Sequence, residues 1–219
     1  GLLNFAQLQN INLTIIGPEA PLVMGIVDRF IAAGLPCFGP KAEAAQLEGS
    51  KSFTKDFLKR HGIPTADYSC FNELEPAITY IKSKGAPIVV KADGLAAGKG
   101  VIVAMTEEEA ITAVEDILEA KSFGEAGSKI VIEEFLEGEE ASYIVVTNGT
   151  EVLPLATSQD HKARDNNDLG PNTGGMGAYS PAPIITASLD ERVMNEIINP
   201  TLAGLKKDGL ESVSYTHLR

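Results

Sequence analysis

The sequence predicts an α/β protein that begins with a parallel βαβ unit, and three segments near its start support this prediction. The runs INLTIIG (residues 11–17) and LPCFGP (residues 35–40) are short and apolar and each meets a Gly-Pro pair, which is typical of strands. We expect the first of these strands to be buried. Between them, PLVMGIVDRFIAAG (residues 21–34) has apolar side chains at helical spacing and stops at Gly34, a residue typical of helix C-terminal caps. Two parallel strands need such a helical crossover.

The chain changes character after this unit. KAEAAQLEGSKSFTKDFLKRHG (residues 41–62) predicts two helices that meet near Gly49 and Ser50, with Ser50 capping the second. We therefore expect a domain boundary near residue 50, so that residues 1–50 form a partial N-terminal domain.

The middle of the chain alternates extended and helical patterns. Extended segments or strands are expected at IPTADYSCF (63–71), PIVVKA (87–92), VIVAM (101–105), KIVIEEFL (129–136), EEASYIVVTNG (139–149) and EVLPLATSQ (151–159). Helices are expected over residues 73–85 and 107–120, the second because its first three residues are acidic and suit the helix dipole.

Two further elements complete the chain. A polar, glycine-rich loop is expected from about Asp160 to Pro183, and loops of this length inside a compact domain are usually functional or disordered. A last helix follows through about Lys207, with a break or kink near Pro200.

The composition limits the class of protein. The net charge of −12 argues against a general nucleic-acid binder and against a protein that binds anionic membranes. No apolar run is long enough to span a bilayer and the first residues do not resemble a signal peptide, so we expect a cytoplasmic location. The chain begins with Gly in what reads as the middle of a helix, which suggests a fragment. Cys37 and Cys70 lack metal-ligand spacing and are expected to be buried thiols of a reducing cytosol.

The stretch KADGLAAGKG (residues 91–100) looks at first like a phosphate-binding loop. A Walker loop needs four residues between its two glycines, a hydroxyl residue after the lysine, and a helix that follows. Here three residues separate Gly94 from Gly98, Gly100 follows Lys99, and the next run is strand-like. The spacing also differs from G-x-G-x-x-G, so the Walker and dinucleotide-binding interpretations are both excluded.

What remains is a strand, a glycine-rich loop and a second strand, with Lys91 and Lys99 on either side. Gly94, Gly98 and Gly100 would let the backbone approach an anion closely. Taken alone, such a loop is better explained as a flexible hairpin tip with incidental lysines.

Three other features favour a nucleotide site. Glu133 and Glu140 flank a break at Gly138 and could converge on the hydroxyls of a sugar, while the backbone of residues 134–136 could meet an adenine edge. Lys51, near a helix start, is a candidate third phosphate contact, and the loop from Asp160 is too polar to be buried without a ligand. Each feature has a simpler explanation as a solvated acidic turn, a surface lysine or a mobile loop.

Five segments together closely resemble the phosphoribosylamine–glycine ligases, an ATP-grasp family of purine biosynthesis. They are GPEAPL (17–22), LEGSKSFTKDF (47–57), KADGLAAGKGVIVA (91–104), VIEEFLEGEEAS (131–142) and LPLATSQDHKARDNNDLGPNTGGMGAYSP (153–181). The resemblance implies a partial pre-ATP-grasp domain over residues 1–50 and an incomplete two-lobed ATP-grasp domain over residues 51–211. Residues 212–219 form a tail that does not resemble the family.

The resemblance also implies a reaction. Members join glycine to 5-phosphoribosylamine and convert ATP to ADP and phosphate with Mg²⁺ or Mn²⁺, through glycyl phosphate. The complete enzyme is implied to be a monomer that binds neither nucleic acid nor membrane. Phosphoryl transfer of this kind depends on positioning and charge neutralisation.

By position in these motifs, the resemblance assigns two groups of residues. ATP contacts are implied for Lys51, Lys91, Gly94, Gly98, Lys99, Gly100, Glu133, Glu134, Phe135, Leu136 and Glu140, with the last at the ribose. Contacts to phosphoribosylamine and glycine are implied for Glu19, Lys162, Asn172, Thr173, Gly174, Gly175, Met176 and Gly177.

The sequence departs from the family at both ends. The opening strand with its Gly-Asn-Gly-Gly loop is missing, and the family's metal ligands, a Glu and an Asn, lie beyond the last residue. We therefore assign no metal ligand here. Two alternatives remain beside the ligase: a nucleotide-binding fragment without turnover, and an ATP-grasp ligase that uses another acid.

Overall fold

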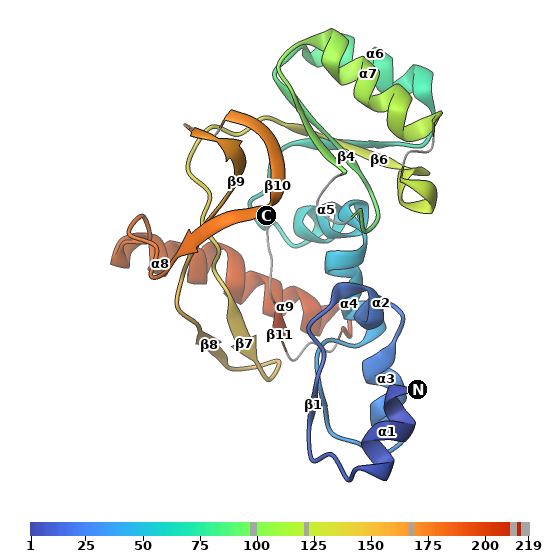
Figure 1. Ribbon diagram of the computed structural model, residues 1–219. Coiled ribbons are helices and arrows are strands. Elements are labelled where there is room, and N and C mark those ends of the chain that lie inside the picture. Colours follow the sequence, from blue (N-terminus) through green and yellow to red (C-terminus); the bar gives the residue numbers. More distant parts are fainter. Residues whose placement is uncertain (97–99, 121–122, 167–168, 211–213, 216–219) are drawn as a thin grey trace.

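The computed structural model describes residues 1–96, 100–120, 123–166, 169–210 and 214–215. Figure 1 shows a small N-terminal unit, a pair of central helices, an upper lobe in which helices cover a sheet, and a second lobe of helices and short strands. The chain is thus an α/β protein, as the sequence predicts.

The N-terminal unit is a βαβ arrangement. It contains α1 (Leu2–Leu8), β1 (Thr14–Ile15), α2 (Glu19–Val23), α3 (Ile26–Ala32) and β2 (Cys37–Phe38). The two strands are parallel, with Thr14 opposite Cys37, which confirms the predicted crossover. The predicted single helix is wrong in one detail, because Gly25 adopts a φ of 77° and separates α2 from α3.

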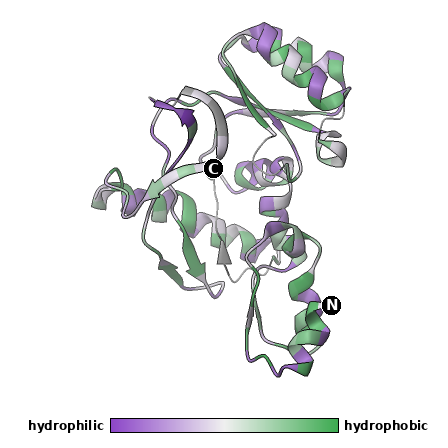
Figure 2. Cartoon of the chain, in the orientation of Figure 1, coloured by the Kyte–Doolittle hydropathy of each residue, from purple (hydrophilic) through white to green (hydrophobic). Residues whose placement is uncertain are grey.

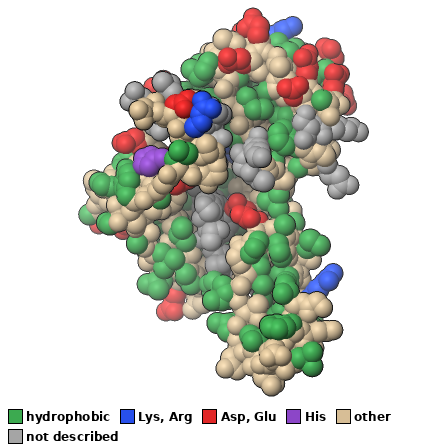
Figure 3. Space-filling view, in the orientation of Figure 1, with side chains coloured by type: hydrophobic (Ala, Val, Ile, Leu, Met, Phe, Trp, Pro, Cys, Tyr) green, Lys and Arg blue, Asp and Glu red, His purple; other side chains and the backbone are tan. Residues whose placement is uncertain are grey.

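The first strand is not buried as expected. Ile15 is 68% exposed, and other apolar side chains of the unit, including Leu2, Phe5 and Leu8, are exposed as well. Figure 3 shows apolar side chains gathered over this part of the molecule. The reason is that β1 and β2 form a sheet of two strands within the described residues, which leaves little to cover them.

Two helices connect this unit to the upper lobe. They are α4 (Ala42–Gly49) and α5 (Lys51–Arg60), and Ser50 Oγ accepts a hydrogen bond from Phe53 N–H at 3.2 Å. This confirms both the helix break and the predicted cap. Phe57 and Leu58 of α5 are buried against Leu205 from the end of the chain.

The upper lobe is an antiparallel sheet covered on one face by two helices (Figure 1). The strands are β3 (Tyr68–Phe71), β4 (Ile88–Ala92), β5 (Val101–Ala104) and β6 (Ile130–Glu134), in the order β3-β6-β4-β5. The helices are α6 (Leu74–Lys84) and α7 (Glu107–Leu118), and a 3₁₀ turn (Gly124–Gly127) precedes β6.

Alternation of side chains divides the strands between two environments. Val90 and Ile132 point to the helices and share a buried core with Ile81 and Val114. The opposite face carries the polar residues described below. Helix α7 begins with a capping box in which Thr106 and Glu109 bond reciprocally.

The second lobe holds a small sheet and the C-terminal helices. The strands are β7 (Val145–Thr147), β8 (Val152–Pro154) and β11 (Ser214–Tyr215), with β7 between the other two. A π-helical turn (Met194–Ile198) separates α8 (Ala187–Val193) from α9 (Asn199–Lys207), and Pro200 lies in the first turn of α9. The break predicted near Pro200 is therefore confirmed.

The polar segment predicted as a loop from Asp160 to Pro183 is largely a two-stranded ribbon. Strands β9 (Gln159–Asp165) and β10 (Leu169–Tyr179) pair antiparallel, with register shifts on either side of Asn172. Figure 2 shows β9 as polar and β10 as nearly neutral, unlike the apolar strands of the upper sheet. The loop prediction fails because neither strand has the apolar alternation that identifies a half-buried strand.

Candidate functional site

A buried cluster of charges lies on the face of the upper sheet away from α6 and α7. Lys91 Nζ lies 2.7 Å from Glu133 Oε2, and Lys55 Nζ lies 3.1 Å from the same oxygen. The side chains of Lys55 and Glu133 are 6% and 7% exposed, whereas that of Lys91 is 16% exposed. Of the two lysines, Lys91 is therefore the one closer to solvent.

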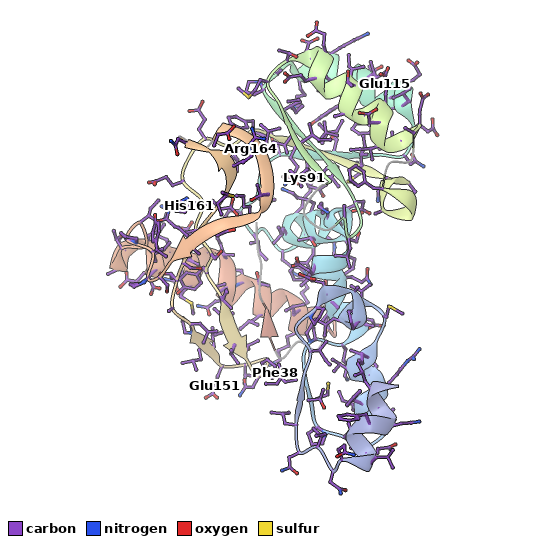
Figure 4. All side chains as sticks on the ribbon, in the orientation of Figure 1. Phe38, Lys91, Glu115, Glu151, His161 and Arg164 are labelled. Atoms are coloured by element: carbon purple, nitrogen blue, oxygen red, sulfur yellow. The ribbon has the colours of Figure 1, made fainter. Side chains whose placement is uncertain are left out.

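Strand register explains how this cluster forms. Lys91 pairs with Val131 and Val89 pairs with Glu133 across β4 and β6, so Lys91 and Glu133 are diagonal neighbours on one face. Lys55 reaches them from α5, which lies on this side of the sheet. Figure 4 shows Lys91 below α6 and α7, close to where α5 passes the sheet.

Asp93 joins the glycine-rich loop (residues 93–100) to the start of α5. Its carboxylate accepts hydrogen bonds from Ser52 N–H at 2.6 Å and from the Ser52 hydroxyl at 2.9 Å. Lys129 Nζ donates to the same hydroxyl at 2.9 Å. The acidic group thus satisfies a free N–H at the N-terminus of α5, where negative charge is favourable.

Lys51 lies beside the same segment. Its Nζ donates to the carbonyl oxygen of Gly94 at 3.0 Å and to that of Asp93 at 3.4 Å. Burial lowers the pKa of Lys51, the negative charge of Asp93 opposes this, and the positive charge of Lys91 lowers the pKa further. The positive charges of Lys51 and Lys91 are therefore near enough to influence each other.

Close packing also explains why two positions of the loop, 94 and 100, are glycine. A Cβ on Gly94 would lie 2.8 Å from Ala126 Cβ, and one on Gly100 would lie 2.6 Å from Ala96 Cβ. Gly98 and Lys99 lie outside the described residues. Strands β4 and β5 pair antiparallel on either side, with Lys91 opposite Val101, so the predicted hairpin arrangement is confirmed.

Residues 134–136 include the last residue of β6 and the two residues after it. Glu134 N–H donates to Asp67 O at 2.9 Å, so its N–H already has a partner, while the Phe135 side chain is half-buried and Leu136 is exposed. A pocket of about 400 Å³ opens beside this segment, and its lining includes Asp67, Tyr80, Lys84, Glu134 and Phe135. Because Tyr80 and Lys84 belong to α6, this pocket lies away from the lysine cluster.

Glu140 lies next to Lys162 of β9. Lys162 Nζ is 3.0 Å from Glu140 Oε1 and 3.2 Å from Asp160 Oδ2, and Gln159 Nε2 donates to Glu140 O at 3.2 Å. These contacts connect the segment after β6 to strand β9 of the ribbon. Glu133 and Glu140 were expected to lie around one sugar. In the structure each has its own lysine partners: Glu133 contacts Lys91 and Lys55, and Glu140 contacts Lys162.

The segment predicted for the small substrates lies on β10. Thr173 Oγ1 donates to Lys162 O at 3.0 Å and accepts from Gly175 N–H at 3.0 Å, so it links the two strands of the ribbon. Gly174, Gly175, Met176 and Gly177 are exposed, and Asn172 pairs with Ala163 through the backbone. Glu19 is exposed at the start of α2, and no described contact joins it to β10.

Sequence reasoning missed Lys55 and Asp93. Lys55 follows Lys51 by one helical turn, and residues four apart on a helix share a face, so the spacing could have identified it. Asp93 gave no such signal, because its partner Ser52 is remote in the sequence.

The described part of the chain has no group of three or more His, Cys, Asp or Glu side chains arranged to hold a metal ion. None of its helices combines the length and apolar character that a bilayer span requires. The thiols Cys37 and Cys70 are free and half-buried rather than fully buried, and burial raises the pKa of each.

Comparison with protein families decides the assignment. The family model for the phosphoribosylglycinamide synthetase ATP-grasp (A) domain matches residues 49–218, and the model for the N domain of the same synthetase matches residues 1–48. The chain belongs to the phosphoribosylglycinamide synthetase family. Together the two matches extend over nearly the whole chain.

Relatives of this synthetase family agree. The chain is 61% identical over 217 residues to the phosphoribosylamine–glycine ligase of Allochromatium vinosum, covering 99% of this chain and 51% of that protein. It is 66% identical over 208 residues to the ligase of the same name from Escherichia coli K12, covering 95% of this chain and 48% of that protein. The chain thus spans about half the length of these curated relatives.

Solved structures support the ATP-grasp fold of the synthetase family. The crystal structure of phosphoribosylamine–glycine ligase from Thermotoga maritima matches with a TM-score of 0.77 and 34% identity, covering 91% of this chain and 48% of that one. A Campylobacter jejuni biotin carboxylase in complex with β-γ-ATP matches with a TM-score of 0.72 and 18% identity, covering 100% of this chain and 51% of that one. At this identity the second match supports the fold alone.

Proposed function

We propose that the protein to which this chain belongs joins glycine to 5-phosphoribosylamine, with conversion of ATP to ADP and phosphate. The observation that carries the proposal is the cluster of Lys51, Lys55, Lys91 and Glu133 beside a glycine-rich loop, in a chain whose relatives bear the name of that ligase. Since the net charge of the chain is −12, attraction of a triphosphate must come from such placed cations.

The chemistry has two steps. A carboxylate oxygen of glycine attacks the γ-phosphorus of ATP, the bond to the β-phosphate oxygen breaks, and ADP leaves glycyl phosphate behind. The amine of phosphoribosylamine then attacks the acyl carbon, phosphate leaves with the electrons of the C–O bond, and the amine loses a proton to solvent. Both steps depend on charge neutralisation and on holding the reactants together.

Lys51 and Lys91 hold phosphate oxygens, and the glycine-rich loop covers them. The backbone of residues 134–136 meets the adenine edge through groups other than the engaged Glu134 N–H, and Glu140 binds ribose. Because Lys55 and Lys91 both contact the carboxylate of Glu133, we assign Glu133 to orienting Lys91 rather than to contact with adenine.

The small substrates are assigned to the ribbon. Lys162 and residues 172–177 of β9 and β10 would line the site for glycine and phosphoribosylamine, with Glu19 from the N-terminal unit. For the divalent ion of the reaction, Mg²⁺ or Mn²⁺, the described part of this chain has no group of three or more His, Cys, Asp or Glu side chains that could hold it, and no step is assigned to it. We place the protein in the cytoplasm.

Substrate-dependent ADP release tests this proposal. The full-length protein should release ADP only when ATP, glycine and phosphoribosylamine are all present. Release that does not depend on glycine, or none at all, would contradict the ligase assignment.

A second candidate is that the chain alone binds nucleotide without turnover. It is favoured because the lysine cluster is present, whereas the described residues lack a group that could hold a metal ion. Calorimetric titration of the 219-residue chain with ATP, together with an assay for ADP, separates the two. Binding without ADP release supports the second candidate, and robust substrate-dependent release contradicts it.

A further inference from the structure

The two lysines that share Glu133 do not have the same surroundings. Lys55 Nζ contacts three oxygen acceptors: Glu133 Oε2 at 3.1 Å, Thr65 Oγ1 at 2.7 Å and Ala66 O at 3.4 Å. A lysine ammonium has three N–H donors, so this set can occupy all of them. The ring of Tyr68, 5.8 Å from Nζ, adds a further environment that favours a cation.

Lys91 has a more open environment. Its Nζ donates to Glu133 Oε2 at 2.7 Å, and its side chain is 16% exposed against 6% for Lys55. Lys91 can therefore turn toward a ligand, whereas Lys55 is buried and held by protein oxygens. We therefore expect Lys91 to contact the phosphate directly and Lys55 to act indirectly, through Glu133.

The charges of the cluster then determine how strongly Lys91 attracts an anion. The three side chains of Lys55, Lys91 and Glu133 together carry one net positive charge, and little water is present to screen it. Without Lys55, the carboxylate of Glu133 would cancel the charge of Lys91 and would itself repel a phosphate at close range.

We propose that Lys55 is a positioning residue for nucleotide binding, which neutralises Glu133 so that Lys91 presents an uncompensated positive charge to the phosphates. The inference rests on the proposed function, because it presupposes that ATP binds beside Lys91. It differs from a direct role, in which Lys55 touches the ligand, and from a purely structural role, in which Lys55 only stabilises the sheet.

Burial lowers the pKa of Lys55, whereas the charge of Glu133 and its hydrogen bond act in the opposite direction. Replacing Lys55 should leave Glu133 buried with Lys91 as its one remaining cationic partner among the described contacts, which draws Lys91 away from the ligand.

The test is a set of variants of the full-length protein titrated with adenosine, ADP and ATP by calorimetry. Lys55→Met should weaken ATP binding by about tenfold or more and adenosine binding by less than about twofold, since the effect acts on phosphate charge. Lys55→Arg should stay within about threefold of the wild type, because it keeps the positive charge. Equal losses for adenosine and ATP would show a structural role and overturn the proposal.

The decisive comparison removes both charges. Lys55→Met should cost clearly less ATP affinity in the Glu133→Gln background than in the wild type, because without the carboxylate Lys55 has nothing to neutralise. An equal loss in the two backgrounds would show that Lys55 acts on the nucleotide independently of Glu133 and would overturn the proposal. If Lys55→Met alone fails to fold, the double variant can still be compared with Glu133→Gln, since it carries no unpaired buried carboxylate, and a loss of about tenfold or more between them would overturn the proposal.

Lys59→Met is the matched control. Lys59 lies one turn further along α5, is exposed, and has its Nζ at 5.9 Å from the same Tyr68 ring. Its replacement should leave ATP affinity unchanged. If the wild type itself does not bind ATP, the proposed function fails. If the wild type binds and Lys55→Met binds equally well, only the role of Lys55 is refuted.

Discussion

Ser52 donates its backbone N–H to the carboxylate of Asp93 at 2.6 Å, and this bond joins helix α5 to the strand end that leads into the glycine-rich loop. The same carboxylate accepts from the Ser52 hydroxyl at 2.9 Å. Asp93 therefore caps a helix that is remote from it in the sequence. The interaction fixes Lys51 and Lys55, which lie on that helix, relative to Lys91 on β4.

Asp93→Ala should destabilise the chain. Loss of a charged acceptor leaves the Ser52 N–H without this partner at a helix terminus, which we expect to cost about 1–3 kcal/mol of unfolding free energy. Urea unfolding measures the change. Glu115→Ala, on the exposed face of α7, is the control and should change stability little. Equal stability of the two variants would show that Asp93 is not a cap.

Lys91→Met in the full-length protein should weaken ATP binding on the order of 10- to 100-fold, equivalent to roughly 1.5–3 kcal/mol for a charge-assisted contact. Calorimetric titration provides the measurement. Lys82→Met, at an exposed position of α6, keeps the change in net charge but lies outside the cluster. Similar affinities for these two variants would place the phosphates elsewhere.

Glu140→Ala should reduce affinity for ribose nucleotides more than for their 2′-deoxy counterparts. A carboxylate accepts hydrogen bonds from sugar hydroxyls, and this contribution disappears when either partner is removed. Comparing ATP with 2′-deoxy-ATP on both proteins gives the coupling. Glu139→Ala, at the preceding and also exposed position, should show no such preference. Equal losses for the two nucleotides would rule out a ribose contact.

Gly204→Ala should destabilise the contact between α9 and α5. A Cβ at this position would lie 2.8 Å from His61 Cγ and 2.9 Å from Phe57 Cζ. We expect a cost of about 1–3 kcal/mol, despite the better helix propensity of alanine. Thermal unfolding measures this. Gly17→Ala, with no atom within 4 Å of the added Cβ, should behave like the wild type.

Tyr143→Phe should reveal a pH-dependent stabilisation of the second lobe. The Tyr143 hydroxyl donates to Asp190 Oδ1 at 2.6 Å, and burial together with this bond raises the pKa of Tyr143 to about 12. Because the folded pKa lies above the unfolded value of about 10, the stabilisation is complete below that pH and is lost as the pH rises toward 12.

The difference in unfolding free energy between wild type and Tyr143→Phe should therefore be larger at pH about 8 than at pH about 11. Urea unfolding at both values tests this. A constant difference would mean that Tyr143 ionises alike in the folded and unfolded states.

Much of the fold follows from local pattern. The parallel pair of β1 and β2, the break at Ser50 and the four strands of the upper sheet all have short apolar runs and clear punctuation in the sequence. The ribbon of β9 and β10 was not predictable in this way, because its pairing is held by backbone bonds between polar and glycine-rich strands. The exposure of β1 likewise depends on which neighbours cover it rather than on its own residues.

The candidate site was predictable in its residue types but not in its pairings. Lys91 and Glu133 were identified separately, and only the register of β4 against β6 shows that they are neighbours. The contact of Lys55 depends on how α5 lies on the sheet, and that of Asp93 on a hydrogen bond between distant segments. No local sequence pattern predicts such tertiary contacts.

Lys51 donates to the main-chain oxygens of Asp93 and Gly94. If Lys51 holds a phosphate, as we propose, the anion must replace these bonds, and the two peptide oxygens then need other hydrogen-bond donors. A monovalent anion such as chloride interacts too weakly with Lys51 to compensate for the loss of these hydrogen bonds. The site should therefore bind a polyphosphate in preference to simple cellular anions. Because these bonds hold the glycine-rich loop to Lys51, their loss would couple the conformation of the loop to anion binding.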